Sequence, residues 1–382
     1  MNKIIYADNS ATTAVSEKAA AAMMPYFREH FGNPSAIYGY GQEAKKAIED
    51  ARRKAAKSIG ALNNELFFTS GGTESDNWAI YGVCESKAKK GNHIISTAIE
   101  HTAVLRTLEK LQTQGFDITL LEPDVYGQIT EEQLEKNIRP DTILISIMTA
   151  NNVVGTILPI KKLCGVAHKH GVTFHTDAVQ AVGHIPINVR DLGIDLLSMS
   201  AHKFHGPKGA GGLFAKLQAA PPPYLTGGGQ EKGYRSGTEN VPGIVGMAAA
   251  IEEATEKLSD NMKKITAYRD KLIEHICTIP GTYLTGDPVH RLPGLASFVF
   301  EGIKESVFLI NRLNDAGICA SSGSACSASS KEAPHVLTAL GYDKKCARSA
   351  LRISLSEFNT EEEIDILIHK ITYIVAELRH EK

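Results

Sequence analysis

Residues 198–212 read SMSAHKFHGPKGAGG and decide how the sequence around them is interpreted. The apolar run Leu196–Ser200 predicts a buried β-strand, so the polar residues that follow lie at its carboxyl end. Ligands bind at that end of the strands in open α/β sheets. There Lys203, flanked by Ser200 and His202, can be desolvated enough to form a Schiff base with an aldehyde, although a lone lysine is more often a surface side chain. The glycines match neither G-x-G-x-x-G nor G-K-[ST], so a phosphate-loop motif is not indicated.

Outward from this segment, short β-branched runs alternate with helical stretches. This pattern predicts an α/β fold with a mainly parallel, seven-stranded sheet and crossover helices. After residue 212 the alternation of strands and helices ends, and residues 243–279 are predicted to form a long amphipathic helix or a helix pair. We therefore expect a large domain over 14–258 and a smaller α/β domain made of 1–13 and 259–382. The strands expected in the large sheet are Leu66–Thr69, His93–Ser96, Ile118–Glu122, Thr142–Met148, Thr173–Thr176, Leu196–Ser200 and Gly212–Ala215.

Upstream, residues 69–77 read TSGGTESDN, a turn of small residues that opens a helix. Ser70 or Thr73 is expected to cap this helix. Backbone amides exposed at such a helix start form an anion site suited to a phosphate, and the alternative is an ordinary capped helix start.

Two further segments carry titratable groups near expected strand ends. In FHTDAVQA, residues 174–181, Asp177 ends a strand and could pair with a protonated pyridine nitrogen, or could be a simple turn residue. His101 begins a helix after another strand. Its neutral imidazole could stack on a planar ring and move protons, or could be a structural histidine.

Composition and charge exclude several classes of protein. The 382 residues are 43% hydrophobic and carry a formal net charge of −2, so neither a disordered chain nor a nucleic-acid or membrane-surface binder is indicated. Six scattered cysteines suit neither a disulfide framework nor a zinc site, and the His202/His205 pair lacks a third ligand, so we expect no metal. The uncharged run 142–160 contains Asn151 and Pro159, which favours a strand and loop over a membrane span. We expect a cytoplasmic protein.

Several motifs occur together in one order: TSGGTESDN, IEHTAV, NNVVG, HTDAVQ, SAHKFHGPKG, GGGQEKGYRSGTEN and SSGSACSAS. In this order and spacing the chain resembles the NifS/IscS-like cysteine desulfurases. These are pyridoxal 5′-phosphate (PLP) enzymes of the class V aminotransferase group, with fold type I. The resemblance runs from YADNSATT near the start to LRISL and the last helix, which is essentially the whole chain.

The resemblance implies a role for each matching residue. Lys203 would hold PLP covalently, Asp177 would face its ring nitrogen, and His101 would stack on the ring and transfer protons. The rest of the cofactor would be bound by Gly72, Thr73, Asn152, Gln180, Ser200, His202 and Thr238 of the partner subunit. The substrate amino acid would be held by Asn33, Asn152 and Arg352.

Cys326 lies in SSGSACSASS, residues 321–330, a Ser/Gly/Ala segment that buries little apolar area and predicts a flexible loop. The resemblance makes Cys326 the nucleophile that takes sulfur from L-cysteine as a persulfide while L-alanine leaves. It also implies a homodimer and a sulfur-acceptor protein serving iron–sulfur clusters, thiolated cofactors or tRNA. The alternatives are a selenocysteine lyase, another class V lyase or aminotransferase, and a catalytically silent scaffold.

Two residues depart from the family pattern. Val153 stands where the family commonly has an acidic residue, so an apolar contact is expected to replace a polar one near the active site. Glu357 falls in the stretch after the substrate arginine, where it is expected to place an acid near Arg352. Neither departure touches the core catalytic set, and both bear on the identity of the sulfur acceptor.

Overall fold

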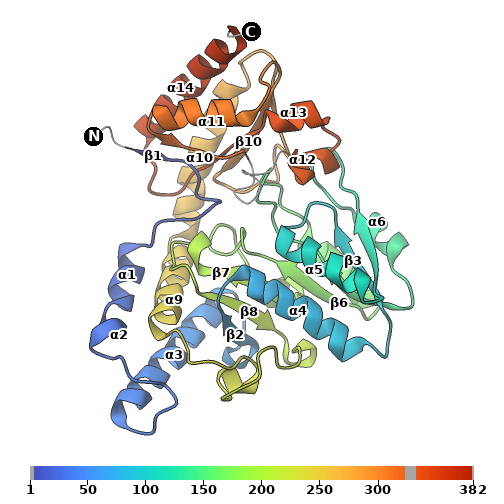
Figure 1. Cartoon of the computed structure of the whole chain (residues 1–382), viewed down its shortest axis with the longest axis vertical. Helices are drawn as coiled ribbons and strands as arrows, with labels where there is room; N and C mark the ends of the chain where they lie inside the picture. Colours follow the sequence, from blue (N-terminus) through green and yellow to red (C-terminus); the bar gives the residue numbers. More distant parts are fainter. Residues whose placement is uncertain (1–3, 323–332, 381–382) are drawn as a thin grey trace.

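The computed structural model describes residues 4–322 and 333–380, and a seven-stranded sheet lies at its centre (Figure 1). The strand order is β2-β8-β7-β6-β5-β3-β4. β8 runs antiparallel to both neighbours, and the other adjacent pairs are parallel, which confirms the predicted mainly parallel sheet. The strands are β2 (Leu66–Thr69), β3 (His93–Thr97), β4 (Asp117–Leu121), β5 (Thr142–Ser146), β6 (Thr173–Asp177), β7 (Leu196–Ser200) and β8 (Gly211–Ala215).

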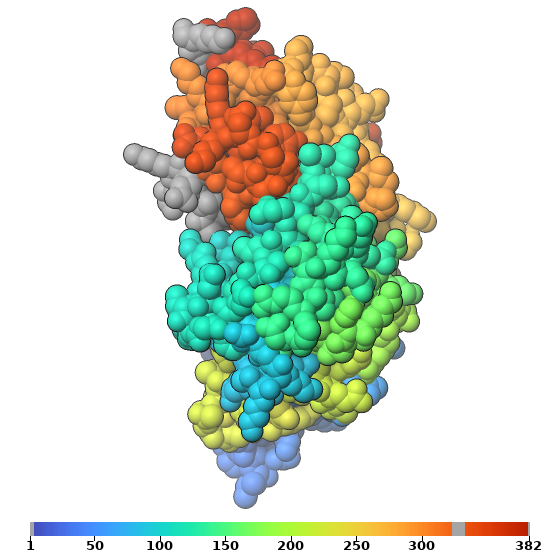
Figure 2. Space-filling view, turned by 90° about the vertical axis from the view of Figure 1, so that its right-hand side faces the viewer, coloured from blue at the N-terminus to red at the C-terminus, as the bar shows by residue number. Residues whose placement is uncertain are grey.

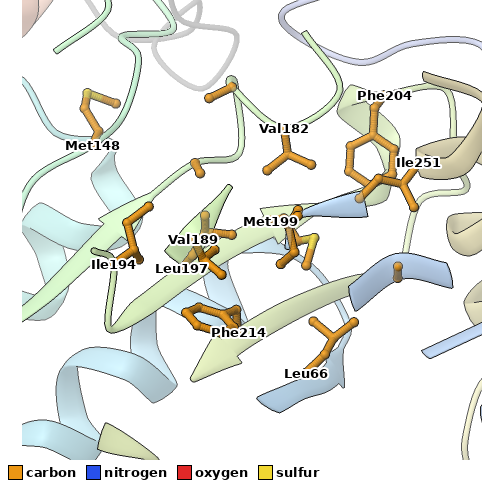
Figure 3. Close-up of a cluster of buried hydrophobic side chains, with 14 of the residues drawn as sticks. Leu66, Met148, Val182, Val189, Ile194, Leu197, Met199, Phe204, Phe214 and Ile251 are labelled. Atoms are coloured by element: carbon orange, nitrogen blue, oxygen red, sulfur yellow. The ribbon is translucent and has the colours of Figure 1, made fainter. Parts of the chain in front are cut away.

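Helices cover both faces of this sheet, because successive side chains along a strand point to opposite sides. Phe68 and Leu197 belong to the core shared with α3, α7 and α9, whereas Phe67 and Leu196 pack with α4 and α5. Figure 3 shows part of the first core, in which side chains of neighbouring strands meet Phe204 and Ile251. The helices around the sheet are α1 (Glu17–Met23), α2 (Pro25–Arg28), α3 (Gly39–Ser58), α4 (Gly72–Lys87), α5 (Thr102–Thr113), α6 (Glu131–Asn137), α7 (Ile160–Lys169), α8 (Val189–Leu192) and α9 (Val241–Glu256).

The C-terminal part of the chain builds a second core around a three-stranded antiparallel sheet. The N-terminal strand joins this part, because β1 pairs in parallel with β11. The stretch predicted as one helix or two is a pair, since α9 ends at Glu256 and α10 begins at Leu258. The predicted domain boundaries stay a prediction. The elements here are β1 (Ile5–Tyr6), α10 (Leu258–Ile276), β9 (Thr282–Leu284), β10 (Leu295–Phe300), α11 (Ser306–Asp315), β11 (Ile318–Cys319), α12 (His335–Ala339), α13 (Lys344–Arg348), β12 (Leu351–Ser354) and α14 (Glu361–His380).

A small apolar cluster joins the two parts of the chain. Val336 and Leu337 of α12 pack with Ile99 and Val153, and all four side chains are buried. Figure 2 shows the orange-red α12–α13 region seated on the teal and green surface below it. Val153 therefore supplies an apolar contact, and that contact is to α12.

The helix after β2 begins differently from the prediction. Its N-cap is Gly71, and neither Ser70 nor Thr73 caps it with a side chain. The backbone amide of Ser70 donates to Glu74 Oε2 instead. Because no side chain caps the first turn of α4, its amides face outward as they do at anion-binding helix starts.

The uncharged run over 142–160 divides into β5 and a loop that leads to α7, as predicted. Within residues 4–322 and 333–380, we find no helix whose length and apolar character would let it cross a membrane.

Candidate active site

A cavity of about 240 Å³ lies where the carboxyl ends of β6 and β7 meet the start of α4. The position is expected, since open α/β sheets bind ligands at the carboxyl ends of their strands. Ten of the residues predicted for the site line this cavity: Gly72, Thr73, His101, Asn152, Asp177, Gln180, Ser200, His202, Lys203 and Arg352.

Lys203 ends a short 3₁₀ turn directly after β7. Its Nζ donates to the backbone carbonyls of Ser10 at 2.6 Å and Ala11 at 2.9 Å. The backbone carbonyl of Lys203 accepts a hydrogen bond from His184 Nε2 at 2.8 Å. The lysine is therefore held at both its backbone and its amine, and the amine lies within the cavity wall.

Asp177 is the last residue of β6 and is 5% exposed. Its Oδ1 accepts the amide of Val179 at 2.9 Å. Burial raises the pKa of this carboxyl, while the nearby His101 and Lys203 act in the opposite direction. His101 is the N-cap of α5, where Nδ1 accepts the Ala103 amide at 3.2 Å and therefore carries no proton. A ring nitrogen of His101 and a carboxyl oxygen of Asp177 lie within 4.8 Å of each other.

Another part of the cavity lining suits an anion. The first turn of α4 brings Gly72 and Thr73 beside Ser200 and His202. A Cβ on Gly72 would meet Val179 Cγ2 at 2.6 Å, so the close approach of the helix start needs glycine. Burial and neighbouring lysines lower the pKa of His202 to about 4, so its imidazole is neutral near pH 7. A neutral imidazole binds an anion as a hydrogen-bond donor.

Arg352 enters the cavity from β12 and is 1% exposed. Its Nη2 lies 2.6 Å from Asp8 Oδ1, and its Nη1 donates to the backbone carbonyl of Asn152 at 2.8 Å. A guanidinium fixed in this way presents a planar set of donors that matches a carboxylate. Gln180 also lines the cavity, and its Nε2 donates to the Ser10 carbonyl.

Three predicted residues are not part of the cavity that the structure describes. Asn33 lies on an exposed loop between α2 and α3, where Oδ1 accepts the Ser35 amide. Thr238 is also exposed, in the segment before α9. Cys326 and most of its predicted loop lie outside the described residues. The roles predicted for Asn33 and Thr238 stay predictions, since neither residue lines the cavity of this chain.

Several residues that line or support the cavity were not predicted from the sequence. Ser10 and Ala11 contact Lys203, Asp8 pairs with Arg352, and Asp76 lines the cavity floor. All four belong to motifs quoted for the resemblance, YADNSATT and TESDN, so their sequence signal was present without an assigned role. Glu357 was expected near Arg352, but its ion-pair partner is His205 at 3.3 Å.

The residues present fit PLP. Its aldehyde suits Lys203, its ring nitrogen suits Asp177, and its phosphate suits the uncapped first turn of α4 with Ser200 and His202. Asp76 lines the same cavity, and its Oδ1 is buried and has no hydrogen-bond partner among the described residues. Arg352 lies beside these groups and can receive the carboxylate of an amino acid.

Comparison with known proteins gives the family. The chain matches the family model for aminotransferase class-V over residues 5–367. It is 50% identical over 380 residues to the cysteine desulfurase IscS of Methanosarcina thermophila, covering 99% of this chain and 94% of that protein. It is 45% identical over 382 residues to a cysteine desulfurase IscS of Clostridium botulinum, covering 99% and 96%. A solved NifS-like protein is 42% identical, with a TM-score of 0.92 and coverage of 98% of this chain and 99% of that one.

Proposed function

The chain belongs to the aminotransferase class-V family, and we propose that its cavity carries out the reaction of a PLP-dependent cysteine desulfurase. The enzyme takes the sulfur of L-cysteine onto a thiol and releases L-alanine. One observation carries the proposal: Lys203, Asp177 and Arg352 line a single cavity. The names of the relatives favour this activity over the selenocysteine lyase, aminotransferase and silent-scaffold alternatives.

We propose that Lys203 anchors the cofactor and then moves the α-proton of the substrate. Bound there, PLP supplies the electron sink for negative charge at the substrate Cα. Asp177 keeps a proton on the ring nitrogen, and its strand-end position is held by the Val179 amide. His101 accepts the Ala103 amide at Nδ1, so its Nε2 is the ring atom that holds or releases a proton toward the substrate.

Substrate binding is assigned to Arg352 and Asn152, which also line the cavity. Arg352 forks onto the carboxylate of L-cysteine, and Asp8 and the Asn152 carbonyl fix the plane of the guanidinium. Asn152 lines the cavity next to this arginine and orients the same substrate. An amino acid held at its carboxylate and near Lys203 has its Cα between the groups that move its proton.

Cys326 is proposed as the sulfur acceptor within the chain. Its sulfur bonds to the substrate sulfur, the Cβ–S bond of cysteine breaks, and proton transfer to carbon completes L-alanine beside a Cys326 persulfide. The described cysteines support this assignment because none lines the cavity. Burial raises the pKa of Cys84 to about 12 and raises the pKa of Cys164 further, which removes the reactive thiolate.

The enzyme is proposed to be a homodimer. Thr238 and Asn33 are exposed and lie outside this chain's own cavity, so their predicted roles need a second copy. Exposed apolar side chains gather along α2 and the start of α3, near Asn33, and a second copy would cover them. They are Met24, Phe27, Phe31, Ile37, Tyr38 and Tyr40. We place the enzyme in the cytoplasm, delivering sulfur to an acceptor protein for iron–sulfur clusters or thiolated products.

The experiment that tests the activity measures alanine and sulfide from purified holoenzyme with L-cysteine and a reducing thiol. Equal amounts of the two products are expected, and Lys203→Ala should form neither while staying folded. Lys216→Ala is the matched control, because this lysine pairs with Asp195 away from the cavity and should keep activity. A Lys203→Ala protein that still produces alanine would overturn the proposal.

A further inference from the structure

A second buried carboxyl lines the cavity close to Asp177. Asp76 belongs to the second turn of α4, is 1% exposed and lines the same cavity. Its Oδ1 has no hydrogen-bond partner among the residues that the structure describes. Carboxyl oxygens of Asp76 and Asp177 and a ring nitrogen of His101 lie within 4.8 Å of one another.

Among the residues that the structure describes, no lysine or arginine forms an ion pair with Asp76, and His175 is the histidine that approaches its Oδ1. His175 of β6 approaches Asp76 Oδ1 to 3.7 Å, but both its ring nitrogens already bond to serine hydroxyls. Burial lowers the pKa of His175 to about 3, so its imidazole is neutral near pH 7. Glu100, from the turn before α5, also acts on Asp76, and burial raises its own pKa to about 8. Asp76 therefore lies near two acids, Asp177 and Glu100, near the neutral His175, and within 4.8 Å of a ring nitrogen of His101.

The two aspartates differ in what stabilises their charged forms. Asp177 accepts the Val179 amide, and His101 and Lys203 favour its ionisation. Burial, and then the charge of Asp177, raise the pKa of Asp76 well above the ordinary value. A hydrogen bond from the Ser198 hydroxyl acts in the opposite direction and favours the charged form. Two carboxyls this close and this deeply buried do not both ionise, and the proton stays on the one with less support.

We propose that Asp76 is a positioning residue for Asp177, and that the pair holds one proton, with Asp76 as its protonated member. The cavity floor then presents a single negative charge, on the carboxyl that faces the ring nitrogen. With Asp76 protonated, its buried and unpartnered oxygen carries no uncompensated charge. The inference rests on the proposed function, because Asp177 matters in this way only to a pyridine ring.

Infrared spectroscopy of the holoenzyme with ¹³C-labelled aspartate tests the proton directly. The carbonyl stretch of a protonated aspartic acid should appear near neutral pH and shift in deuterium oxide. It should be absent from Asp76→Asn and retained in Thr107→Val, which alters a buried contact between α4 and α5 outside the cavity. If Asp76→Asn fails to fold, the labelled wild-type protein still tests whether the pair holds a proton, because the pKa of both Asp76 and Asp177 is raised by burial.

The affinity for PLP tests independently whether Asp76 is neutral. Asparagine has the shape of a neutral aspartic acid, so Asp76→Asn should keep the dissociation constant for PLP within about threefold of the wild-type value, and a larger loss overturns the proposal. A wild-type spectrum without a protonated-aspartate band, or a band that persists in Asp76→Asn, also overturns it. Neither measurement needs turnover, so failure of the desulfurase reaction is distinguishable from failure of this inference.

Discussion

The guanidinium of Arg352 lies 2.6 Å from the carboxylate of Asp8, although 344 positions separate the two residues. Asp8 follows the N-terminal strand β1, and Arg352 lies in β12 near the other end of the chain. Because Asp8 and the Asn152 carbonyl each accept a hydrogen bond from the guanidinium, the orientation of the proposed substrate arginine depends on three distant segments.

Replacement of Arg352 by lysine should therefore impair binding more than chemistry. An ammonium keeps the charge but cannot make two parallel hydrogen bonds to a carboxylate, so KM for L-cysteine should rise about tenfold or more. Steady-state alanine formation measures this effect, with Arg53→Lys on the exposed face of α3 as the control. An unchanged KM in Arg352→Lys would remove Arg352 from the substrate site.

Asp8→Asn should act in the same direction through a different cause. It removes the negative charge that lies 2.6 Å from the buried Arg352 guanidinium, so the melting temperature should fall and KM should rise by a smaller factor than in Arg352→Lys. Calorimetry and steady-state kinetics on the same preparation give both values. A normal KM together with normal stability would contradict the orienting role of Asp8.

The contact between His205 and Glu357 should make stability depend on pH. Burial lowers the pKa of His205, but Glu357 outweighs it, so the pKa rises above its ordinary 6.5, and that contribution is lost as pH rises through the folded value. His205 lowers the pKa of Glu357 below its ordinary 4.5 despite burial, so that contribution is lost as pH falls through the folded value. Both contributions are complete between 4.5 and 6.5.

The melting temperature of Glu357→Gln tests this window. The fall in melting temperature relative to wild type should be largest between pH 4.5 and 6.5 and should shrink in alkaline buffer. Glu362→Gln, an exposed change on α14, should show no such pH dependence. A Glu357→Gln deficit that is constant with pH would mean that the pair does not ionise as described.

Local sequence patterns predicted the parts of the fold that depend on local chemistry. The seven strands, Lys203 after β7 and Asp177 at the end of β6 all follow from apolar runs and the residues that end them. The predicted side-chain cap of α4 was wrong, because the Ser70 amide donates to Glu74 and Gly71 is the N-cap residue. The Arg352–Asp8 pair could not be predicted, because its partners meet only when the segment after β1 forms a backbone bridge to β12, with Asp8 opposite Ser354. A single chain also gives no position for a residue that serves a second copy, as proposed for Thr238.

Subunit complementation tests the proposed homodimer. Thr238→Glu should repel the PLP phosphate and Lys203→Ala should remove its anchor, so each homodimer should be inactive. If Thr238 serves the partner's cavity, a mixed dimer of the two variants contains one intact site and should regain up to half of the wild-type activity. Refolded or co-expressed mixtures supply the mixed dimer. Sedimentation should also show a dimer.

If Thr238 serves its own chain, neither site of the mixed dimer is intact and no activity returns. A sedimentation profile of a monomer that binds PLP tightly would contradict the dimer itself. A mixture that sediments as a dimer but stays inactive would agree with the proposed dimer and refute the proposed role of Thr238.

The central claim is that sulfur passes from L-cysteine to Cys326, and peptide mass spectrometry tests it most directly. Holoenzyme incubated with ³⁴S-labelled L-cysteine, trapped by alkylation and digested, should carry one labelled sulfur on the Cys326 peptide for each alanine formed in a single turnover. Cys326→Ser should bind PLP and L-cysteine but carry no labelled persulfide, whereas Cys319→Ser should behave as wild type. If Cys326→Ser releases alanine and sulfide at the wild-type rate, or the label appears on another cysteine, the account is wrong.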